Sequence, residues 1–290
     1  MKTLPSVLLG AVLLAISSVE TTAQVRQPTV FENPERIVTL SPHLAELVFA
    51  AGAGDLLVGT VEYSDYPPQA LSIARIGDAF RLDSEKLAAL GPDLILAWPG
   101  GNPQPMIDGL RDDGYQVLEL AATGLESVAI QLRRIGELTG HADRAGRAAD
   151  LYLAKVGRLR VENLQKPPIR VFYQVAQRPL FTIGRKQVIS EVVSLCGGIN
   201  IFADLDSLAP VVSMETVLLR NPQVILSART GSANPLDIWL DYPAVAAVRL
   251  ENLYLVDASL LARAGLRLAD GAAQVCRLLD QARRKIARTD

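Results

Sequence analysis

Trp98 and His43 are the residues whose types and positions offer the most chemistry. Trp98 directly follows the apolar run Leu94–Ala97 and precedes Pro-Gly-Gly-Asn, so we expect it at the carboxyl end of a strand, where open α/β sheets bind ligands. His43 follows Pro42 at a predicted strand-to-helix turn on the same side. An indole face can cover a flat ligand, and an imidazole nitrogen can bind a metal. The alternatives are a core tryptophan and a histidine that packs on its own helix.

The remaining chemical groups argue against an enzyme. The only other histidine, His141, is predicted to be solvated, and two distant histidines cannot build a metal site, so any metal should arrive inside the ligand. The chain has no Gly-x-Ser-x-Gly, phosphate-loop or His-Glu metal motif. Asp65 and Asp78 lie near the predicted site, but isolated aspartates are more typical of turns. We expect no catalysis and no intrinsic cofactor, with a periplasmic hydrolase, a chelatase or a sensor domain as alternatives.

The first residues are typical of an export signal. Met1 and Lys2 precede the apolar run Val7–Ile16 and the small residues that follow, which predicts a signal peptide over 1–23 and a mature chain from about Gln24. The run is shorter than the ~20 residues that cross a bilayer. No cysteine follows it for a lipid anchor, so we expect a free periplasmic protein that is not membrane-embedded.

Charge and cysteine count narrow the partners further. A net charge of −2 with interspersed acids and bases gives no basic stripe, which argues against nucleic acid. The two cysteines, Cys196 and Cys276, belong to an exported chain, where an even count indicates a disulfide. Two buried free thiols are the alternative.

Apolar runs alternate with helical patterns along the whole chain, which predicts an α/β fold with mostly parallel sheets. The predicted strands and helices of the first part are Arg36–Leu40, Leu44–Ala51, Leu56–Val61, Leu94–Ala97, Pro105–Asp112 and Tyr115–Leu120. A long helix is predicted after Gly140, ending before Pro167, and a second strand series starts at Arg170.

The two parts share spacing, which indicates a repeat. Glu46 and Glu191 each stand six residues before a glycine, and Glu85 and Glu215 each stand seven residues before a proline that opens an apolar run. We therefore predict two similar lobes, 24–139 and 167–290, joined by one interlobe helix over 140–166. A helix of about 25 residues resists bending, so a largely preformed cleft for a bulky rigid ligand is expected.

The chain resembles the Fe-siderophore, haem and vitamin B12 class of ABC-importer binding proteins, most closely its cobalamin-binding members. The resemblance runs from Arg36 to the C-terminus and is carried by Arg-Ile-Val-Thr-Leu-Ser-Pro at 36–42, Tyr-Ser-Asp-Tyr-Pro-Pro at 63–68, Pro-Asp-Leu-Ile-Leu-Ala-Trp-Pro-Gly-Gly-Asn at 92–102, Cys-Gly-Gly-Ile-Asn-Ile-Phe at 196–202 and Arg-Ala-Gly-Leu-Arg at 263–267. It implies a monomeric, non-enzymatic protein of class III, chelatase-like architecture. Such a protein captures cobalamin or a related corrinoid and delivers it to a permease dimer. Haem or a ferric siderophore is the alternative ligand.

The resemblance also implies site residues. Those expected at the ligand are Pro42, His43, Tyr63, Phe80, Trp98, Phe181, Ser259 and Arg263, and Glu85 and Glu215 are expected to meet permease arginines. Three positions depart from the cobalamin pattern: Ala209 and Ala79 stand where tryptophans are usual, with Phe80 beside the latter, and Ser259 replaces an aspartate. With haem as ligand, Tyr63 or His43 would be the axial residue.

Overall fold

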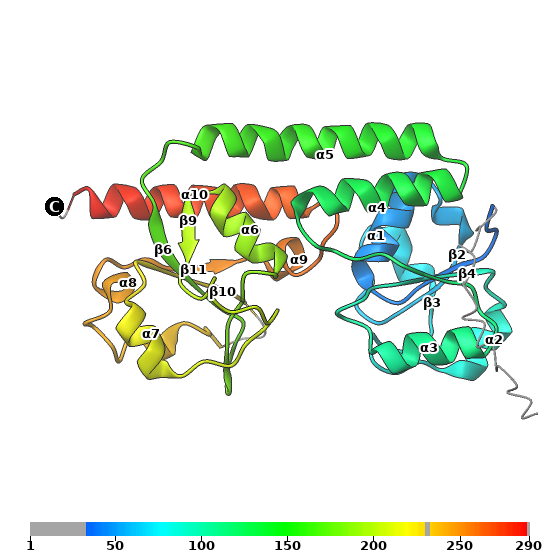
Figure 1. Cartoon of the computed structure of the whole chain (residues 1–290), viewed down its shortest axis with the longest axis horizontal. Coiled ribbons are helices and arrows are strands. Elements are labelled where there is room, and N and C mark those ends of the chain that lie inside the picture. The colour runs from blue at the N-terminus through cyan, green and yellow to red at the C-terminus, as the bar shows by residue number, and fades with distance from the viewer. Residues whose placement is uncertain (1–32, 230–232, 289–290) are drawn as a thin grey trace, which may run out of the picture. The chain divides into compact units, whose positions relative to one another are not determined.

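The computed structural model describes residues 33–229 and 233–288; the expected export signal at 1–23 lies outside them. Two parallel sheets organise the described chain (Figure 1). The first has the strand order β3-β2-β1-β4-β5 and the second β11-β10-β6-β9, with every pair parallel. The first sheet consists of β1 Ile37–Thr39, β2 Leu57–Thr60, β3 Ala74–Arg75, β4 Leu94–Ala97 and β5 Val117–Glu119. The second consists of β6 Ile169–Gln174, β9 Gly198–Asn200, β10 Val224–Ala228 and β11 Leu253–Val256, beside the antiparallel hairpin of β7 Ala176–Gln177 and β8 Leu180–Phe181.

Helices flank both sheets. The first lobe carries α1 Pro42–Ala51, α2 Ser84–Leu90, α3 Gln104–Asp112, α4 Leu125–Leu138 and the short 3₁₀ turns η1 Gly54–Leu56 and η2 Pro68–Ser72. The second lobe carries α6 Val188–Leu195, α7 Met214–Arg220, α8 Ala246–Arg249, α9 Ala258–Leu261, α10 Leu268–Ile286 and the 3₁₀ turn η3 Asp237–Trp239. The remaining helix, α5 Ala142–Asn163, connects them.

The two lobes repeat one topology, as the spacing of the glutamates predicts. Without its edge strand β3, the first sheet has the order β2-β1-β4-β5, which the second reproduces as β9-β6-β10-β11. An equivalent arginine contact is found at the central strand of each sheet. Arg36, before β1, donates to Leu90 O at the end of α2, and Arg170, in β6, donates to Asn221 O at the end of α7. Similar sequence spacing has therefore produced similar local contacts.

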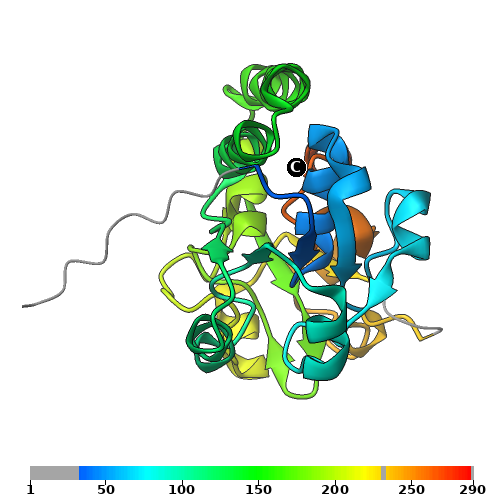
Figure 2. The same cartoon turned by 90° about the vertical axis from the view of Figure 1, so that its right-hand side faces the viewer.

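Helix α5 is the predicted interlobe helix, with slightly narrower bounds than 140–166. Its buried residues recur every three or four positions, which makes one stripe that is apolar up to its last member: Ala145, Ala149, Tyr152, Val156, Leu159 and Asn163. This stripe packs on α4 of the first lobe and on α10 of the second (Figure 1). Figure 2, turned so that the first lobe faces the viewer, shows α5 lying above α4. Gly140, at φ +73°, ends α4 and permits the reversal between the two helices.

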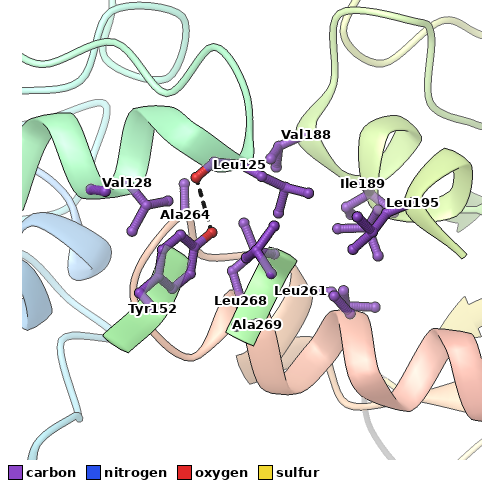
Figure 3. Packing of buried hydrophobic residues seen from close by; sticks show 14 of the residues in the cluster. Leu125, Val128, Tyr152, Val188, Ile189, Leu195, Leu261, Ala264, Leu268 and Ala269 are labelled. Atoms are coloured by element: carbon purple, nitrogen blue, oxygen red, sulfur yellow. Dashed lines mark hydrogen bonds between the residues drawn. The ribbon is translucent and has the colours of Figure 1, made fainter. Parts of the chain in front are cut away.

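The lobes also share a continuous hydrophobic core, which the sequence does not predict. Leu125 of α4 lies beside Val188 of α6 (Figure 3), and both belong to one buried cluster with Leu261 and Leu268, which flank the segment between α9 and α10. The hydroxyl of Tyr152 in α5 donates to Leu125 O at 3.0 Å inside this cluster. Separating the lobes would expose this apolar surface to water, at a cost of ~25 cal/mol per Å². The lobes are therefore joined by packing as well as by α5.

The predicted disulfide is confirmed. Cys196, just after α6, is bonded to Cys276 in α10, and their Cα atoms are 4.7 Å apart. The bond fixes the last long helix to the first helix of the same lobe. In the part of the chain that the structure describes, no helix is both long and apolar enough to cross a membrane.

Candidate ligand-binding site

Trp98 lies where the sequence predicts, directly after β4 at its carboxyl end, and it is half-buried. Its backbone N–H donates to Asn102 Oδ1 at 2.7 Å, and the Asn102 amide donates to Leu40 O and Ala79 O. Asn102 therefore joins three strand-end loops. Gly101 permits the indole to lie against the loop, because a Cβ there would be 1.9 Å from Trp98 Cε3. The ring is held by the backbone around it.

His43 lies behind Trp98 rather than at a surface. Its side chain is in the first turn of α1, after the half-buried Pro42, and the residue is only 3% exposed. Its ring packs edge-on against the indole, with 5.1 Å between centroids, and Nδ1 bonds with Ser41 Oγ. Burial, and secondarily the charge of Arg263, lowers the His43 pKa to about 3, so the ring is neutral. Nε2 has no hydrogen-bond partner among the described residues. The buried His43 ring therefore packs against the protein-facing side of the indole.

Two aromatic residues of the first lobe present their rings to solvent. Tyr63, after β2, is 77% exposed, and Phe80, after β3, is 71% exposed. The Asp78 carboxylate accepts from the backbone N–H groups of Phe80 and Arg81, which fixes the turn that carries Phe80. Large apolar side chains exposed in this way typically mark a binding surface when they gather together. Both rings follow strand ends of the same parallel sheet as Trp98.

The second lobe contributes the expected Phe181 and two apolar residues that sequence reasoning missed, Leu208 and Val211. Phe181 is half-buried in β8 and bridges to Val211, which is itself exposed, as is Leu208. Leu208 reaches the first lobe: a Cβ on Gly100, next to the Trp98 loop, would be 3.6 Å from Leu208 Cδ1. The strand-end loops of both lobes therefore meet here. The signal available in the sequence was the apolar Leu-Ala-Pro-Val-Val run at 208–212.

Ser259 and Arg263 are occupied by protein partners. The Ser259 hydroxyl and backbone N–H both bond to Asp257 Oδ1 at the start of α9. The Arg263 guanidinium binds Glu46 and Asp65 of the first lobe, and its side chain is 15% exposed. The polar groups of Ser259 and Arg263 are thus bound to other protein groups, whereas the rings of Tyr63 and Phe80 face solvent.

Glu85 and Glu215 occupy the second positions of α2 and α7, and both are exposed. The two helices are equally long, and each is capped by a side chain: Asp83 accepts from Lys86 N–H, and Ser213 accepts from Thr216 N–H. A hydrogen bond from Ser213 lowers the pKa of the Glu215 carboxyl, which keeps it ionised. The structure thus gives the two glutamates equivalent positions, each in the first turn of a capped helix of the same length.

The site offers flat and apolar contacts rather than metal ligands. Within residues 33–229 and 233–288, no group of three His, Cys, Asp or Glu side chains is placed to hold a metal ion. The exposed rings and aliphatic side chains after these strand ends can contact a ligand with a broad apolar face, and the backbone-held Trp98 can set its orientation.

Comparison with known proteins identifies the family. Residues 37–258 match the family described as periplasmic binding protein. The chain belongs to this periplasmic binding protein family. Its members are substrate-binding proteins rather than enzymes. The vitamin B12-binding protein of Vibrio cholerae serotype O1 is 37% identical over 252 residues, which cover 87% of this chain and 91% of that protein. The vitamin B12-binding protein of Yersinia pseudotuberculosis is 37% identical over 269 residues, 92% and 91% of the two chains.

Solved structures of the periplasmic binding protein family confirm the predicted two-lobed α/β architecture. The crystal structure of the periplasmic vitamin B12 binding protein of Vibrio cholerae matches with a TM-score of 0.81 at 37% identity, covering 86% of this chain and 98% of that one. The apo periplasmic haem-binding protein of Roseiflexus sp. RS-1 matches with a TM-score of 0.76 over 86% and 98% of the chains. At 24% identity, this second likeness concerns the fold alone.

Proposed function

We propose that this protein captures cobalamin or a related corrinoid in the periplasm and delivers it to the permease of an ABC importer. The observation that carries the proposal is the set of exposed aromatic and aliphatic side chains in the loops that follow strands of both lobes. The ligand class comes from the relatives named vitamin B12-binding proteins, which align over most of both chains.

A corrinoid suits these side chains because it is broad and rigid. Trp98 offers a half-buried indole fixed by Asn102 and Gly101, and Tyr63 and Phe80 offer two solvent-exposed rings. Each ring that stacks on the ligand contributes about 0.5–1.5 kcal/mol beyond the area it buries. Burial of the apolar faces supplies the rest of the affinity.

Calorimetric titration of the mature protein with cyanocobalamin, dicyanocobinamide and haemin in parallel tests this proposal. We expect saturable one-to-one binding of both corrinoids. Binding of haemin alone would contradict the corrinoid assignment. In that case the axial residue would be Tyr63, because His43 is buried behind Trp98, and the tyrosinate-to-iron absorption band would vanish in Tyr63→Phe.

We also propose that Glu85 and Glu215 dock on the permease dimer, one glutamate for each half. Their equivalent, exposed positions at the starts of α2 and α7 support this. Rim charges of this kind mainly set register and encounter rate. The double variant Glu85→Lys/Glu215→Lys should lose stimulation of the permease ATPase and keep its affinity for cyanocobalamin. Glu137→Lys/Glu162→Lys, at exposed sites on α4 and α5, is the control with the same change in net charge. Stimulation that persists in the double variant would remove these residues from the interface.

Export is the last part of the proposal. The chain should reach the periplasm by way of the signal at 1–23 and act there as a monomer. Intact-mass measurement of protein from an osmotic-shock fraction should give a chain that begins near Gln24, and light scattering should give a single-chain mass. A full-length chain found in the cytoplasm would contradict the assignment.

A further inference from the structure

The segment between α9 and α10 belongs to the second lobe by sequence but lies against the first. It carries Arg263, Gly265 and Arg267, and all three approach Glu46 of α1. A Cβ on Gly265 would be 3.2 Å from Glu46 Oε2, so the backbone itself passes close to this carboxylate. The segment is therefore a second connection between the lobes, remote from α5 in sequence.

Glu46 is a buried charge that two guanidinium groups neutralise. The residue is 5% exposed. Arg267 binds both carboxylate oxygens, with Nη2 to Oε1 at 2.7 Å and Nε to Oε2 at 3.1 Å, and Arg263 Nη1 adds a contact to Oε1 at 3.2 Å. A buried carboxylate needs such partners, because burial of an unpaired charge is costly. Glu46 thus fixes the position of Arg263.

Arg263 extends from Glu46 to the turn that carries Tyr63. Its Nη1 donates to Asp65 Oδ1 at 2.5 Å, and its Nη2 donates to Tyr63 O at 2.8 Å. The same guanidinium lowers the pKa of the Asp65 carboxyl, which keeps that partner ionised. We name Glu46, Arg263, Asp65 and the Tyr63 carbonyl the interlobe latch.

The Tyr63 turn needs external support. Tyr63 has φ +65°, a left-handed conformation that is uncommon for a bulky residue and persists where its surroundings impose it. Within the first lobe, Thr60 Oγ1 bonds with Ser64 Oγ, and Arg75 donates to Ser64 O, so these contacts fix the residue after Tyr63. The Tyr63 carbonyl is bound by Arg263 and by the backbone N–H of Asp65. The only side chain bound to this carbonyl in the described structure comes from the other lobe.

The second lobe supplies a matched comparison. Glu191 of α6 corresponds to Glu46 in the repeat and also crosses to the other lobe, where it accepts from Leu125 N–H at 2.7 Å. The residue that Glu191 contacts, Leu125 at the start of α4, is wholly buried, whereas Tyr63 is an exposed aromatic residue. Glu191 therefore joins the lobes without contacting a strand-end ring.

We propose that Arg263, held by Glu46, is a positioning residue that orients Tyr63 toward the ligand rather than a residue that binds the ligand itself. This inference rests on the proposed function in one respect, the placement of Tyr63 at the ligand. The three protein acceptors on its two terminal nitrogens account for the direction of the guanidinium. Through the interlobe latch, the backbone position of Tyr63 in the first lobe depends on Arg263 in the second lobe.

A double-mutant cycle on the full mature chain, with cyanocobalamin as the probe, tests the assignment. Arg263→Gln should raise Kd roughly 2- to 12-fold, the range expected when one stacking ring is displaced. In a Tyr63→Ala background the same change should raise Kd less than about twofold, because the residue it positions is gone. Glu191→Gln should change Kd less than about twofold in either background. An equal loss from Arg263→Gln in both backgrounds would overturn the proposal and make Arg263 a direct ligand contact.

A ligand-free measurement separates failure of the latch from failure of the proposed function. In protein labelled with 3-fluorotyrosine, the ¹⁹F resonance of Tyr63 is assigned by its loss in Tyr63→Phe. Arg263→Gln and Asp65→Asn should shift or broaden that resonance, and Glu191→Gln should leave it unchanged. An unaltered Tyr63 resonance in Arg263→Gln overturns the latch even if cyanocobalamin binds. If Arg263→Gln does not fold, Asp65→Asn decides alone, because the Asp65 side chain is 58% exposed and contributes only the outer contact.

Discussion

Gly101→Ala is expected to weaken ligand binding without altering any ligand-contacting side chain. A Cβ at Gly101 would lie 1.9, 2.1 and 2.6 Å from Cε3, Cζ3 and Cδ2 of Trp98. Carbon atoms in contact are about 3.5–4.0 Å apart, so the indole has to retreat by roughly 1.5 Å. It cannot retreat into the space of His43, which is buried against its edge. The ring must rotate away from its present position.

The magnitude follows from the contact that is lost. One displaced stacking ring removes about 0.5–1.5 kcal/mol of binding free energy, so Kd should rise roughly 2- to 12-fold. The fold should also lose about 1–3 kcal/mol of unfolding free energy from overpacking. Cyanocobalamin titration followed by calorimetry gives the first number, and urea denaturation gives the second.

Tryptophan emission reports the ring directly. The chain has two tryptophans, and Trp239 is wholly buried with its indole N–H bonded to Gln174 Oε1 at 2.6 Å. A red shift in Gly101→Ala therefore comes from Trp98 as it enters water. Gly157→Ala, in α5, is the matched control: its Cβ would meet nothing within 4 Å, so Kd and emission should not change. Unchanged Kd and unchanged emission in Gly101→Ala would refute the reasoning about Trp98.

Three further predictions concern the ligand, the disulfide and pH. Trp98→Ala should raise the cyanocobalamin Kd at least as much as Gly101→Ala while the far-ultraviolet circular dichroism stays the same; an unchanged titration would remove Trp98 from the site. Cys196→Ser/Cys276→Ser opens a loop of 80 residues, so the free energy of unfolding in urea should fall by about 4.5 kcal/mol, and no loss would contradict the chain-entropy account. Burial raises the pKa of the Glu191 carboxyl, so the folded protein binds that proton more tightly than the unfolded chain. The contribution of Glu191 to stability should therefore decline as pH rises from about 4.3 through the raised folded value. In urea titrations at several pH values, Glu191→Gln should lose this contribution, so that the wild type minus variant difference falls with rising pH; a difference that does not depend on pH would contradict the assignment.

Local pattern was enough to predict the sheets and the repeat. The strand Leu94–Ala97 is found with the predicted bounds, because a short apolar run between Pro92 and a Pro-Gly-Gly turn has few other structures to adopt. The spacing from Glu85 to Pro92 matches that from Glu215 to Pro222. In the structure it gives two helices of equal length, α2 and α7, each followed by a central strand of its own sheet, β4 or β10. Helix α5 was predictable because no proline interrupts it.

Contacts between residues far apart in sequence were not predictable in the same way. Glu46 and Arg263 are 217 residues apart, and neither periodicity nor propensity encodes which distant charges will meet. His43 follows a strand end, as expected, yet its ring lies below Trp98, because α1 turns it toward the core. Leu208 looked like an ordinary loop residue, and its approach to Gly100 depends on how the lobes pack.

The reciprocal roles of Glu46 and Glu191 bear on how such a protein could have originated. Each acid belongs to one repeat and accepts hydrogen bonds from the residues leading into the last long helix of the other repeat. An ancestral polypeptide that comprised one repeat would have carried this carboxylate without its partners. Two copies facing each other across a twofold axis would have satisfied both acids at once, since residue i of one copy meets residue j of the other and the reverse. The present chain has the internal arrangement of such a homodimer whose subunits are fused through α5.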